Sequence, residues 1–373
     1  TQKDQAYLES ELATLDSTWR SSGSYDSLSS YLKLNYGSYM DEDTFQSLYA
    51  DQVLADSYRQ HYQDSLTYTD EETEAYYNEH TNDLDTFGYT VFTVQATVEE
   101  QTDEEGNTVE MTDEEKTAAL ETAKADALAT AQAIQSRLTN GEDAQALADE
   151  YADALYSSSI HTTAMGSTFS SAAYADWLYD AARQSGDITL AELDRSESSA
   201  YNYYVVQFDS RTRDDSATAD VRHILIGAAS SGTTPTQEEF DAAEAEAQAL
   251  LGQWKAGDAT EDSFAALAVQ NTDDSGSQST GGQYSGISST DSLEPNFLNW
   301  ALDPARQPGD TGIVKNESSS IQGWHIMYFV GWDDPAWEYT VKSTWKESDT
   351  SEWLASLTEN VEAVHGSGLD LVS

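Results

Sequence analysis

Two of the six histidines in this chain lie in the middle of apolar segments. His223 is central in residues 221–226, and His325 is central in residues 323–331. Apolar runs of this length, bounded by glycine or polar residues, are typical of buried strands. Two such strands pair naturally in one sheet, and their pairing would bring the two imidazoles together. The two histidines are therefore the first candidates for chemistry.

Two other interpretations of these histidines stay open at this point. A lone histidine in a strand is more often a satisfied core residue than a catalytic one, although two strands that can be neighbours make both readings comparable. Imidazole also binds metal ions. However, the chain has no cysteine, no third histidine lies nearby, and nothing matches a zinc spacing. The sequence therefore predicts no metal site and no cofactor.

The segment between the two histidines supplies the elements that must position them. A helix is expected over residues 237–254, because Thr236 and the acidic residues after it form a capped helix start. A second, shorter helix is expected over residues 262–270. Residues 271–290 are rich in serine, glycine and aspartate, and they are predicted to form a loop.

This region carries an ordered series of motifs. They are Val221-Arg222-His223-Ile224-Leu225-Ile226, residues 262–268, Thr272-Asp273-Asp274-Ser275, Gly281-Gly282, Pro308-Gly309-Asp310 and residues 323–329. Together, over roughly 110 residues, they resemble the parvulin-type peptidyl-prolyl cis-trans isomerases. The resemblance implies an α+β fold with a small antiparallel sheet flanked by helices. It also implies that His223 and His325 are the family's paired strand histidines, and that Asp274 lies where the family carries cysteine or aspartate beside the substrate carbonyl.

The resemblance also implies which residues contact the substrate proline. Leu293 and Phe297 correspond to the apolar proline-contacting residues of the family, and Tyr284 falls near a family leucine. The alternative role for Leu293 and Phe297 is plain core packing. One departure concerns the rim of this pocket, because the usual Gly-Gly-Asp-Leu-Gly is replaced by Gly-Gly-Gln-Tyr-Ser at residues 281–285.

The chain also contains an internal repeat. From Trp177 to Asp187, seven residues recur identically 123 positions later, from Trp300 to Asp310. A constant offset over seven positions indicates duplication of one fold unit. The first copy is expected to hold a strand over residues 89–94, a helix over residues 113–139 and a strand over residues 203–208.

The repeat does not extend to the candidate chemistry. Tyr204 falls where the second copy has His325, and the first strand of the first copy contains no histidine. A loose alignment puts Ala154 opposite Asp274. Residues shared by the two copies are therefore expected to be structural, and those present only in the second copy are candidates for catalysis.

Both ends of the chain are predicted to be helical. Four helices are expected within residues 1–84, and the fourth opens with a capping box at Thr69 and Glu72. A last helix, over about residues 348–365, is expected to fold back onto them. This arrangement resembles the PrsA/SurA-like foldases. The expected domains are a helical domain of residues 1–84 completed by 335–373, a degenerate parvulin-like domain of residues 85–213, and an isomerase domain of residues 214–334.

The charge of the chain narrows the classes of partner. It carries 68 acidic and 17 basic residues, a net charge of −51. Binding to nucleic acid or to an anionic membrane is therefore not expected, because both need lysine and arginine. No apolar stretch is long enough to span a bilayer. The sequence starts at Thr1 inside a helical pattern, so we expect an export signal or anchor to have been removed and the protein to act outside the cytoplasm.

These observations favour an extracytoplasmic foldase that isomerises X–Pro bonds of unfolded or partly folded exported proteins without covalent chemistry. The main alternative is a non-catalytic chaperone or binding module that uses parvulin-like domains as scaffolds. A weaker alternative is an acidic surface-layer or adhesion protein that reuses the fold.

Overall fold

The computed structural model describes residues 1–22, 25–98, 101–102, 108–109, 111–195, 200–318 and 320–359. Its contacts divide the chain into two compact units. One unit comprises Thr1–Tyr76 and Asp215–Ser373, and the other comprises Tyr77–Asp214. The terminal helices and the sheet that carries both candidate histidines therefore share one unit. A separate helical domain stays a prediction.

The first of these units is built on a four-stranded antiparallel sheet of order β8-β7-β10-β9. Its strands are β7 (Ala217–Gly227), β8 (Gln283–Ile287), β9 (Thr311–Asn316) and β10 (Gly323–Pro335). The two central strands are the predicted histidine strands, and they are directly paired. The prediction that the two imidazoles lie on neighbouring strands is confirmed.

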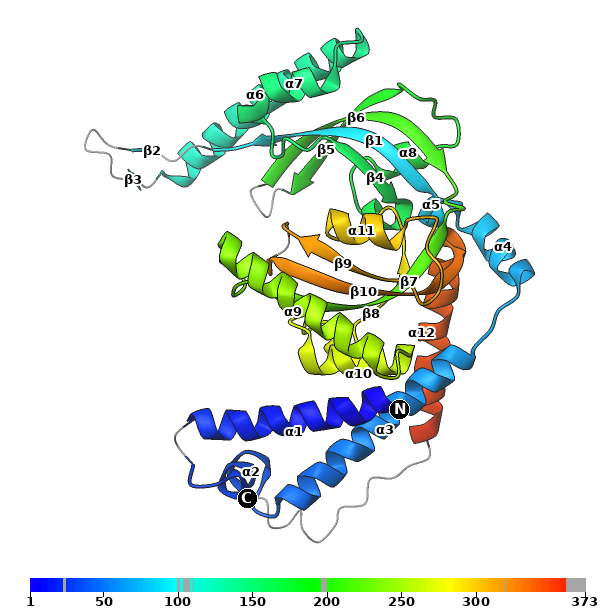
Figure 1. Cartoon of the computed structure of the whole chain (residues 1–373). Helices are drawn as coiled ribbons and strands as arrows, with labels where there is room; N and C mark the ends of the chain where they lie inside the picture. Colours follow the sequence, from blue (N-terminus) through cyan, green and yellow to red (C-terminus); the bar gives the residue numbers. More distant parts are fainter. Residues whose placement is uncertain are drawn as a thin grey trace. The chain divides into compact units, whose positions relative to one another are not determined.

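Helices cover both faces of this sheet (Figure 1). They are α9 (Gln237–Ala256), α10 (Glu261–Asn271) and α11 (Pro295–Ala301). Ile224 and Ile326 point to α9 and α10, whereas Val221 and Met327 point to the α11 side. Side chains alternate between the faces of a strand. Both histidines therefore share the face of Val221 and Met327, the α11 side.

Within the same unit, the terminal helices pack on the sheet and its covering helices and on one another. They are α1 (Gln2–Ser22), α2 (Leu28–Tyr36), α3 (Glu42–Ser65), α4 (Asp70–Glu79) and α12 (Ala336–Thr358). The helix α1 lies along α10, where the Gln2 N–H donates to Asp262 Oδ2 at 2.9 Å. The Trp353 ring of α12 stacks on Tyr62 of α3, with the ring centroids 4.1 Å apart. Among the described residues, no helix combines the length and apolar character needed to cross a bilayer.

The second unit has a four-stranded antiparallel sheet of matching order, β4-β1-β6-β5. Its elements are α5 (Thr81–Leu84), β1 (Thr86–Ala96), β2 (Gln101–Thr102), β3 (Thr108–Val109), α6 (Asp113–Thr139), α7 (Ala144–Glu150), β4 (His161–Met165), α8 (Ala175–Tyr179), β5 (Ile188–Arg195) and β6 (Ala200–Thr212). The predicted helix over residues 113–139 has those bounds in the structure. The acidic insert predicted at residues 103–107 lies outside the described residues.

Corresponding backbone contacts support the internal repeat. In the first copy of the repeat the Gly186 N–H donates to the Phe208 carbonyl at 2.8 Å. In the second copy the Gly309 N–H donates to the Phe329 carbonyl at 2.8 Å. Each bond closes the turn between the repeated Gly-Asp pair and the last long strand. The repeated residues therefore build the same turn twice.

The repeated side chains also make matching contacts. The Arg183 guanidinium lies 4.7 Å from the Trp177 ring, and that of Arg306 lies 4.4 Å from the Trp300 ring. Such stacking covers an aromatic face with a cation. The expectation that the shared tryptophan and arginine are scaffold residues agrees with these contacts.

Two sequence expectations need correction. The segment predicted as loop contains β8, and the last helix begins at Ala336 rather than near Ser348. The predicted end of that helix, residues 360–365, lies outside the described residues. Strands β4, β5 and β9 were also absent from the expectation.

Candidate functional site

The two histidines meet across the central strand pair. His223 of β7 lies opposite Met327, and His325 of β10 lies opposite Leu225. The Nδ1 atoms of His223 and His325 are 3.0 Å apart, within hydrogen-bonding distance. Their side chains are 3% and 6% exposed. The pair is therefore held inside the sheet face, with little room for the rings to turn.

Asp274 reaches this pair from the loop that follows α10. The loop is fixed to β7, because the Asp273 N–H donates to the Leu225 carbonyl at 2.8 Å. Thr272 Oγ1 adds a second link, since it accepts the N–H of Leu225 and that of Asp274, each at 3.1 Å. Asp274 Oδ2 then lies 3.0 Å from His223 Nε2. The structure thus brings together all three residues predicted to be catalytic.

The charge state of the group follows from its surroundings. Hydrogen bonding from His223 holds the pKa of the Asp274 carboxyl well below its usual range, so this group is an anion at neutral pH. Burial lowers the pKa of His325 to about 3, and the neighbouring His223 adds to this effect. When both imidazoles are neutral, one donor order satisfies these contacts: His325 Nδ1–H donates to His223 Nδ1, and His223 Nε2–H donates to the Asp274 carboxylate.

Aromatic and apolar side chains surround the two imidazoles. Phe297 of α11 is 3% exposed, and its ring centroid lies 5.3 Å from that of His223 and 5.2 Å from that of His325. The ring of Tyr284 on β8 lies 5.0 Å from the His223 ring. Leu293 is half-buried against the same apolar cluster. The three residues predicted to contact proline therefore lie together on the histidine side of the sheet.

Sequence reasoning missed two members of this neighbourhood. Met327 is fully buried and lies opposite His223 in the strand pair. Ser277 is 4% exposed and hydrogen-bonds to Asp274. The strand alternation around His325 could have indicated Met327. Nothing in a serine-rich loop distinguishes Ser277 from its neighbours.

The glycine pair at residues 281–282 has a steric role beside the histidine. Gly282 has φ +71°, and a Cβ there would lie 2.0 Å from the carbonyl oxygen of His223. Its own carbonyl accepts the His223 N–H at 2.8 Å. The close approach of the loop to β7 therefore requires glycine at this position.

We expect Gly282→Ala to destabilise the unit by at least about 2 kcal/mol, since it adds a backbone clash to left-handed strain. Thermal unfolding followed by circular dichroism measures this effect. The matched control is Gly309→Ala, because Gly309 has φ +91° but open space around its Cβ position. Equal losses of stability in the two variants would contradict the proposed close approach.

The depressed pKa of His325 predicts a pH dependence of stability. In the unfolded chain this histidine binds a proton near pH 6.5, whereas in the folded chain it does so near pH 3. The unfolded state therefore binds more protons than the folded state between these two pH values. The contribution of neutral His325 to the stability of the fold is consequently lost as the pH falls through this window. We expect the free energy of unfolding, measured with urea from pH 7 to pH 4, to fall more steeply for the wild type than for His325→Gln, by up to about 1.4 kcal/mol per pH unit. If the free energy of unfolding has the same pH dependence in the wild type and in His325→Gln, the lowered pKa of His325 is contradicted.

The matching positions in the other unit carry different side chains. Strand register places Val91 at the position of His223 and Tyr204 at that of His325, in agreement with the sequence expectation for Tyr204. Valine has no ionisable side chain, and Tyr204 carries a phenol in place of the imidazole. The repeat therefore preserves the sheet and replaces both imidazoles.

The expected counterpart of Asp274 needs correction. In each copy of the repeat, a loop residue donates its N–H to a carbonyl of the first long strand. Tyr156 donates to Thr93 of β1 at 2.9 Å, and Asp273 donates to Leu225 of β7 at 2.8 Å. Ser157 follows Tyr156, and Asp274 follows Asp273, so Ser157 is the counterpart of Asp274. The placement of Ala154 opposite Asp274 is wrong, because counting along the chain could not resolve loops of different length.

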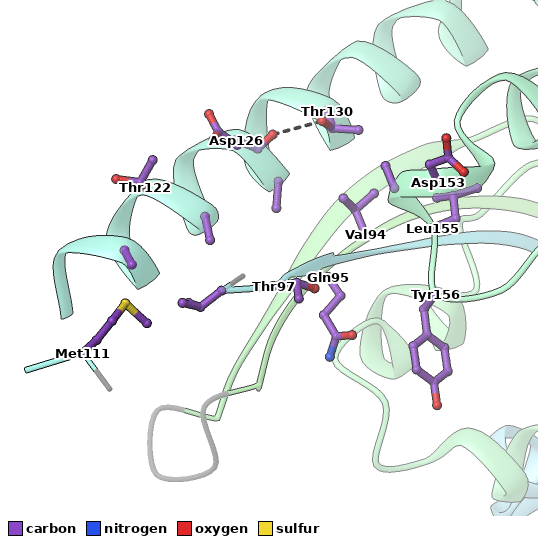
Figure 2. A pocket seen from close by; sticks show the side chains of 15 residues that line it. Val94, Gln95, Thr97, Met111, Thr122, Asp126, Thr130, Asp153, Leu155 and Tyr156 are labelled. Atoms are coloured by element: carbon purple, nitrogen blue, oxygen red, sulfur yellow. Dashed lines mark hydrogen bonds between the residues drawn. The ribbon is translucent and has the colours of Figure 1, made fainter. Parts of the chain in front are cut away.

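The unit without the histidine pair contains a cavity of about 700 Å³ (Figure 2). It lies between α6 and the end of β1, and the carboxylates of Asp126 and Asp153 line it. Gln95 of β1 also lines it, and Tyr156 at its border is 76% exposed. This cavity has no imidazole in its wall.

The metal interpretation of the histidines gains no support from the geometry. Within the part of the chain that the structure describes, no group of three or more histidine, cysteine, aspartate or glutamate side chains could hold a metal ion. The histidines instead form a hydrogen-bonded chain that ends on one carboxylate.

Comparison with known proteins identifies the class of this site. Residues 203–329 match the family model of the PPIC-type PPIASE domain. The match covers β7 to β9 and β10 as far as Phe329, and therefore His223, Asp274 and His325. The chain thus contains a PPIC-type, that is parvulin-type, peptidyl-prolyl isomerase domain. Such a domain implies peptide substrates with X–Pro bonds.

Among solved structures, the chain is similar to the peptidylprolyl isomerase PrsA from Bacillus anthracis, determined at 1.70 Å, with 18% sequence identity and a TM-score of 0.24. The similarity covers 41% of this chain and 64% of that protein. No curated protein matches the chain. The family model matches the histidine-bearing sheet; of the other sheet, β4-β1-β6-β5, it includes only part of β6.

Proposed function

We propose that this protein catalyses cis–trans isomerisation of X–Pro bonds at the site formed by His223, His325 and Asp274. The observation that carries the proposal is the hydrogen-bonded series of two buried imidazoles and one carboxylate, next to an aromatic and apolar surface. The matching positions of the sheet β4-β1-β6-β5 lack this series.

The chemistry asked of the site is rotation without bond cleavage. Amide resonance sets a barrier of about 18–20 kcal/mol, and for X–Pro bonds the uncatalysed step takes tens to hundreds of seconds. Resonance puts negative charge on the amide oxygen, and twisting the bond removes part of it. A catalyst that destabilises the planar amide more than the twisted one lowers the barrier.

Each side chain has a proposed part in this reaction. Phe297, Leu293 and the ring of Tyr284 receive the proline and keep water from the amide. The carboxylate of Asp274, with 20% of its side chain exposed, presents a fixed negative charge to the substrate carbonyl. That charge repels the oxygen of the planar amide more strongly than that of the twisted amide. The two histidines hold the carboxylate in place from within the sheet.

Exchange spectroscopy by NMR tests this function. A short peptide with one X–Pro bond, mixed with a catalytic amount of the whole chain, should show exchange cross-peaks between its cis and trans forms at mixing times where the free peptide shows none. A peptide with alanine in place of proline is the blank. Absence of exchange at any enzyme concentration would refute the proposal.

We further propose that the protein works as an extracytoplasmic foldase on exported polypeptides. The resemblance of its helical ends to PrsA/SurA-like foldases supports this role. Exposed aromatic side chains on the N-terminal segment offer contacts for unfolded chains: Tyr36, Tyr39 and Tyr58 are 52%, 69% and 62% exposed. Refolding of a proline-limited client, followed with and without the protein, tests the role. Acceleration of peptide exchange without acceleration of client refolding would leave an isomerase that is not a foldase.

The cavity of the other unit favours a second, non-catalytic function for that unit. On the edge of β1 that faces the cavity, the Val91 N–H and the Thr93 carbonyl are paired with the chain's own loop. Backbone groups alternate along a strand, so those of Gln95 face the same edge beside the cavity. An extended client segment could add there as a strand. We expect a His223→Ala/His325→Ala chain to bind peptide although it no longer catalyses isomerisation. If the variant loses peptide binding together with activity, the cavity beside β1 is not a separate binding site.

A further inference from the structure

One oxygen of the candidate carboxylate receives three side-chain contacts. Asp274 Oδ2 lies 3.0 Å from His223 Nε2, 2.5 Å from Ser277 Oγ and 3.3 Å from the Tyr284 hydroxyl. The other oxygen, Oδ1, accepts the N–H of Gly276 at 3.1 Å. An ionised carboxylate is acceptor-only, so all three polar side-chain groups can donate to it at once.

Ser277 is fixed in this position by its own loop. It is 4% exposed, and its carbonyl accepts the N–H of Gly282 at 2.8 Å. Its Oγ also lies 3.2 Å from His223 Nε2. The serine hydroxyl therefore sits where the histidine and the carboxylate meet, and it can turn its proton only toward the carboxylate if the histidine donates as well.

Tyr284 is fixed from the opposite side. Its ring packs edge-on against His223 and lies 5.7 Å from the Phe297 ring, so the hydroxyl is carried by a side chain that is already held. Burial raises the pKa of this hydroxyl, and the charge of Asp274 adds to the effect. Tyr284 therefore keeps its proton and acts as a donor.

These contacts decide where the negative charge points. With His223 as its sole side-chain partner, the carboxylate of Asp274 could rotate about its side-chain bonds toward solvent. Two further donors on the same oxygen, from β8 and from the loop, remove this freedom. Charge-assisted hydrogen bonds of this kind are about twice as strong as neutral ones.

We propose that Ser277 and Tyr284 are positioning residues for isomerisation, which hold Asp274 ionised and aimed at the substrate carbonyl and thereby fix the proton order of the two histidines. The inference rests on the proposed isomerase function of this site. It deepens that function by adding two hydroxyl groups that do not need to touch the substrate amide.

Single and combined substitutions in the whole chain test the inference. We expect Ser277→Ala and Tyr284→Phe each to lower kcat/KM for an X–Pro peptide about 5- to 20-fold, with most of the loss in kcat, because a hydrogen bond to a charged group is lost. In an Asp274→Ala background, Ser277→Ala should change kcat/KM less than 2-fold, since the partner is gone. The acid limb of the pH profile should move to higher pH in both single variants.

A readout that needs no turnover separates this inference from the function on which it rests. The carboxyl carbon of Asp274, followed by NMR, should titrate at a pH higher by about one unit or more in Ser277→Ala and Tyr284→Phe than in the wild type. Ser279→Ala is the matched control, because Ser279 is exposed on the same loop. Unchanged titration, or an equal loss of kcat/KM with and without Asp274, would overturn the inference. A wild type without isomerase activity would overturn the proposed function instead.

Discussion

Replacing Asp274 with alanine should lower kcat/KM for X–Pro isomerisation about 100-fold while the chain stays folded. The size is taken from the usual cost of removing one preorganised electrostatic group at a reacting centre, about 10²- to 10³-fold. The fold should survive because 20% of this side chain is exposed and its loop is tied to β7 by backbone bonds and by Thr272. Peptide exchange and thermal unfolding, measured on the same sample, check both halves.

The matched control for this prediction is Asp273→Ala. Asp273 precedes Asp274, and its Oδ2 accepts the N–H of Gly227 at 2.8 Å, away from the histidines. This variant should lose some stability and keep most of its kcat/KM per folded molecule. If Asp274→Ala instead melts the protein at the temperature of the assay, the assignment of Asp274 to chemistry rather than to scaffold is mistaken.

The second large effect concerns stability. Trp300→Ala should lower the free energy of unfolding by about 3 kcal/mol, the usual cost of removing a large packed aromatic side chain. Trp300 packs under the Arg306 guanidinium and beside Phe329, and its indole lies against Gly312 of β9. Urea unfolding followed by tryptophan fluorescence measures the loss.

The repeat supplies the control for Trp300. Its counterpart Trp177 makes the same stack with Arg183 in the unit that lacks the histidines. Trp177→Ala should also destabilise the protein, yet leave kcat/KM unchanged at temperatures where both units are folded. Loss of activity in Trp177→Ala without unfolding would contradict the division of the repeat into scaffold and chemistry.

Part of this site could be predicted from the sequence because its residues lie in strongly patterned segments. His223 and His325 interrupt apolar runs that can only be buried strands, and strand pairing then brings them together. Asp274 has no such pattern, and it was placed only by resemblance to a family. The repeat added the contrast with Tyr204, which the strand register supports.

Other features depend on tertiary contacts that no local pattern contains. The strand β8 has the turn-like sequence Gln-Tyr-Ser-Gly-Ile and becomes a strand because β7 offers it an edge. The helix α12 follows β10 without a loop, and β-branched Thr340, Val341 and Thr344 obscure its first turns. Ser277 is one of several serines in its loop, and its burial beside His223 is decided by the turn at Gly282.

X–Pro peptide exchange by the whole chain, before and after His223→Ala/His325→Ala, is the most direct test of catalysis at the histidine pair. We expect clear catalysis by the wild type and the uncatalysed rate in the variant, although the sheet of the other unit is untouched. Wild-type rates in the variant would place catalysis elsewhere in the chain. No catalysis by either protein would make the histidines core residues and the protein a binding module.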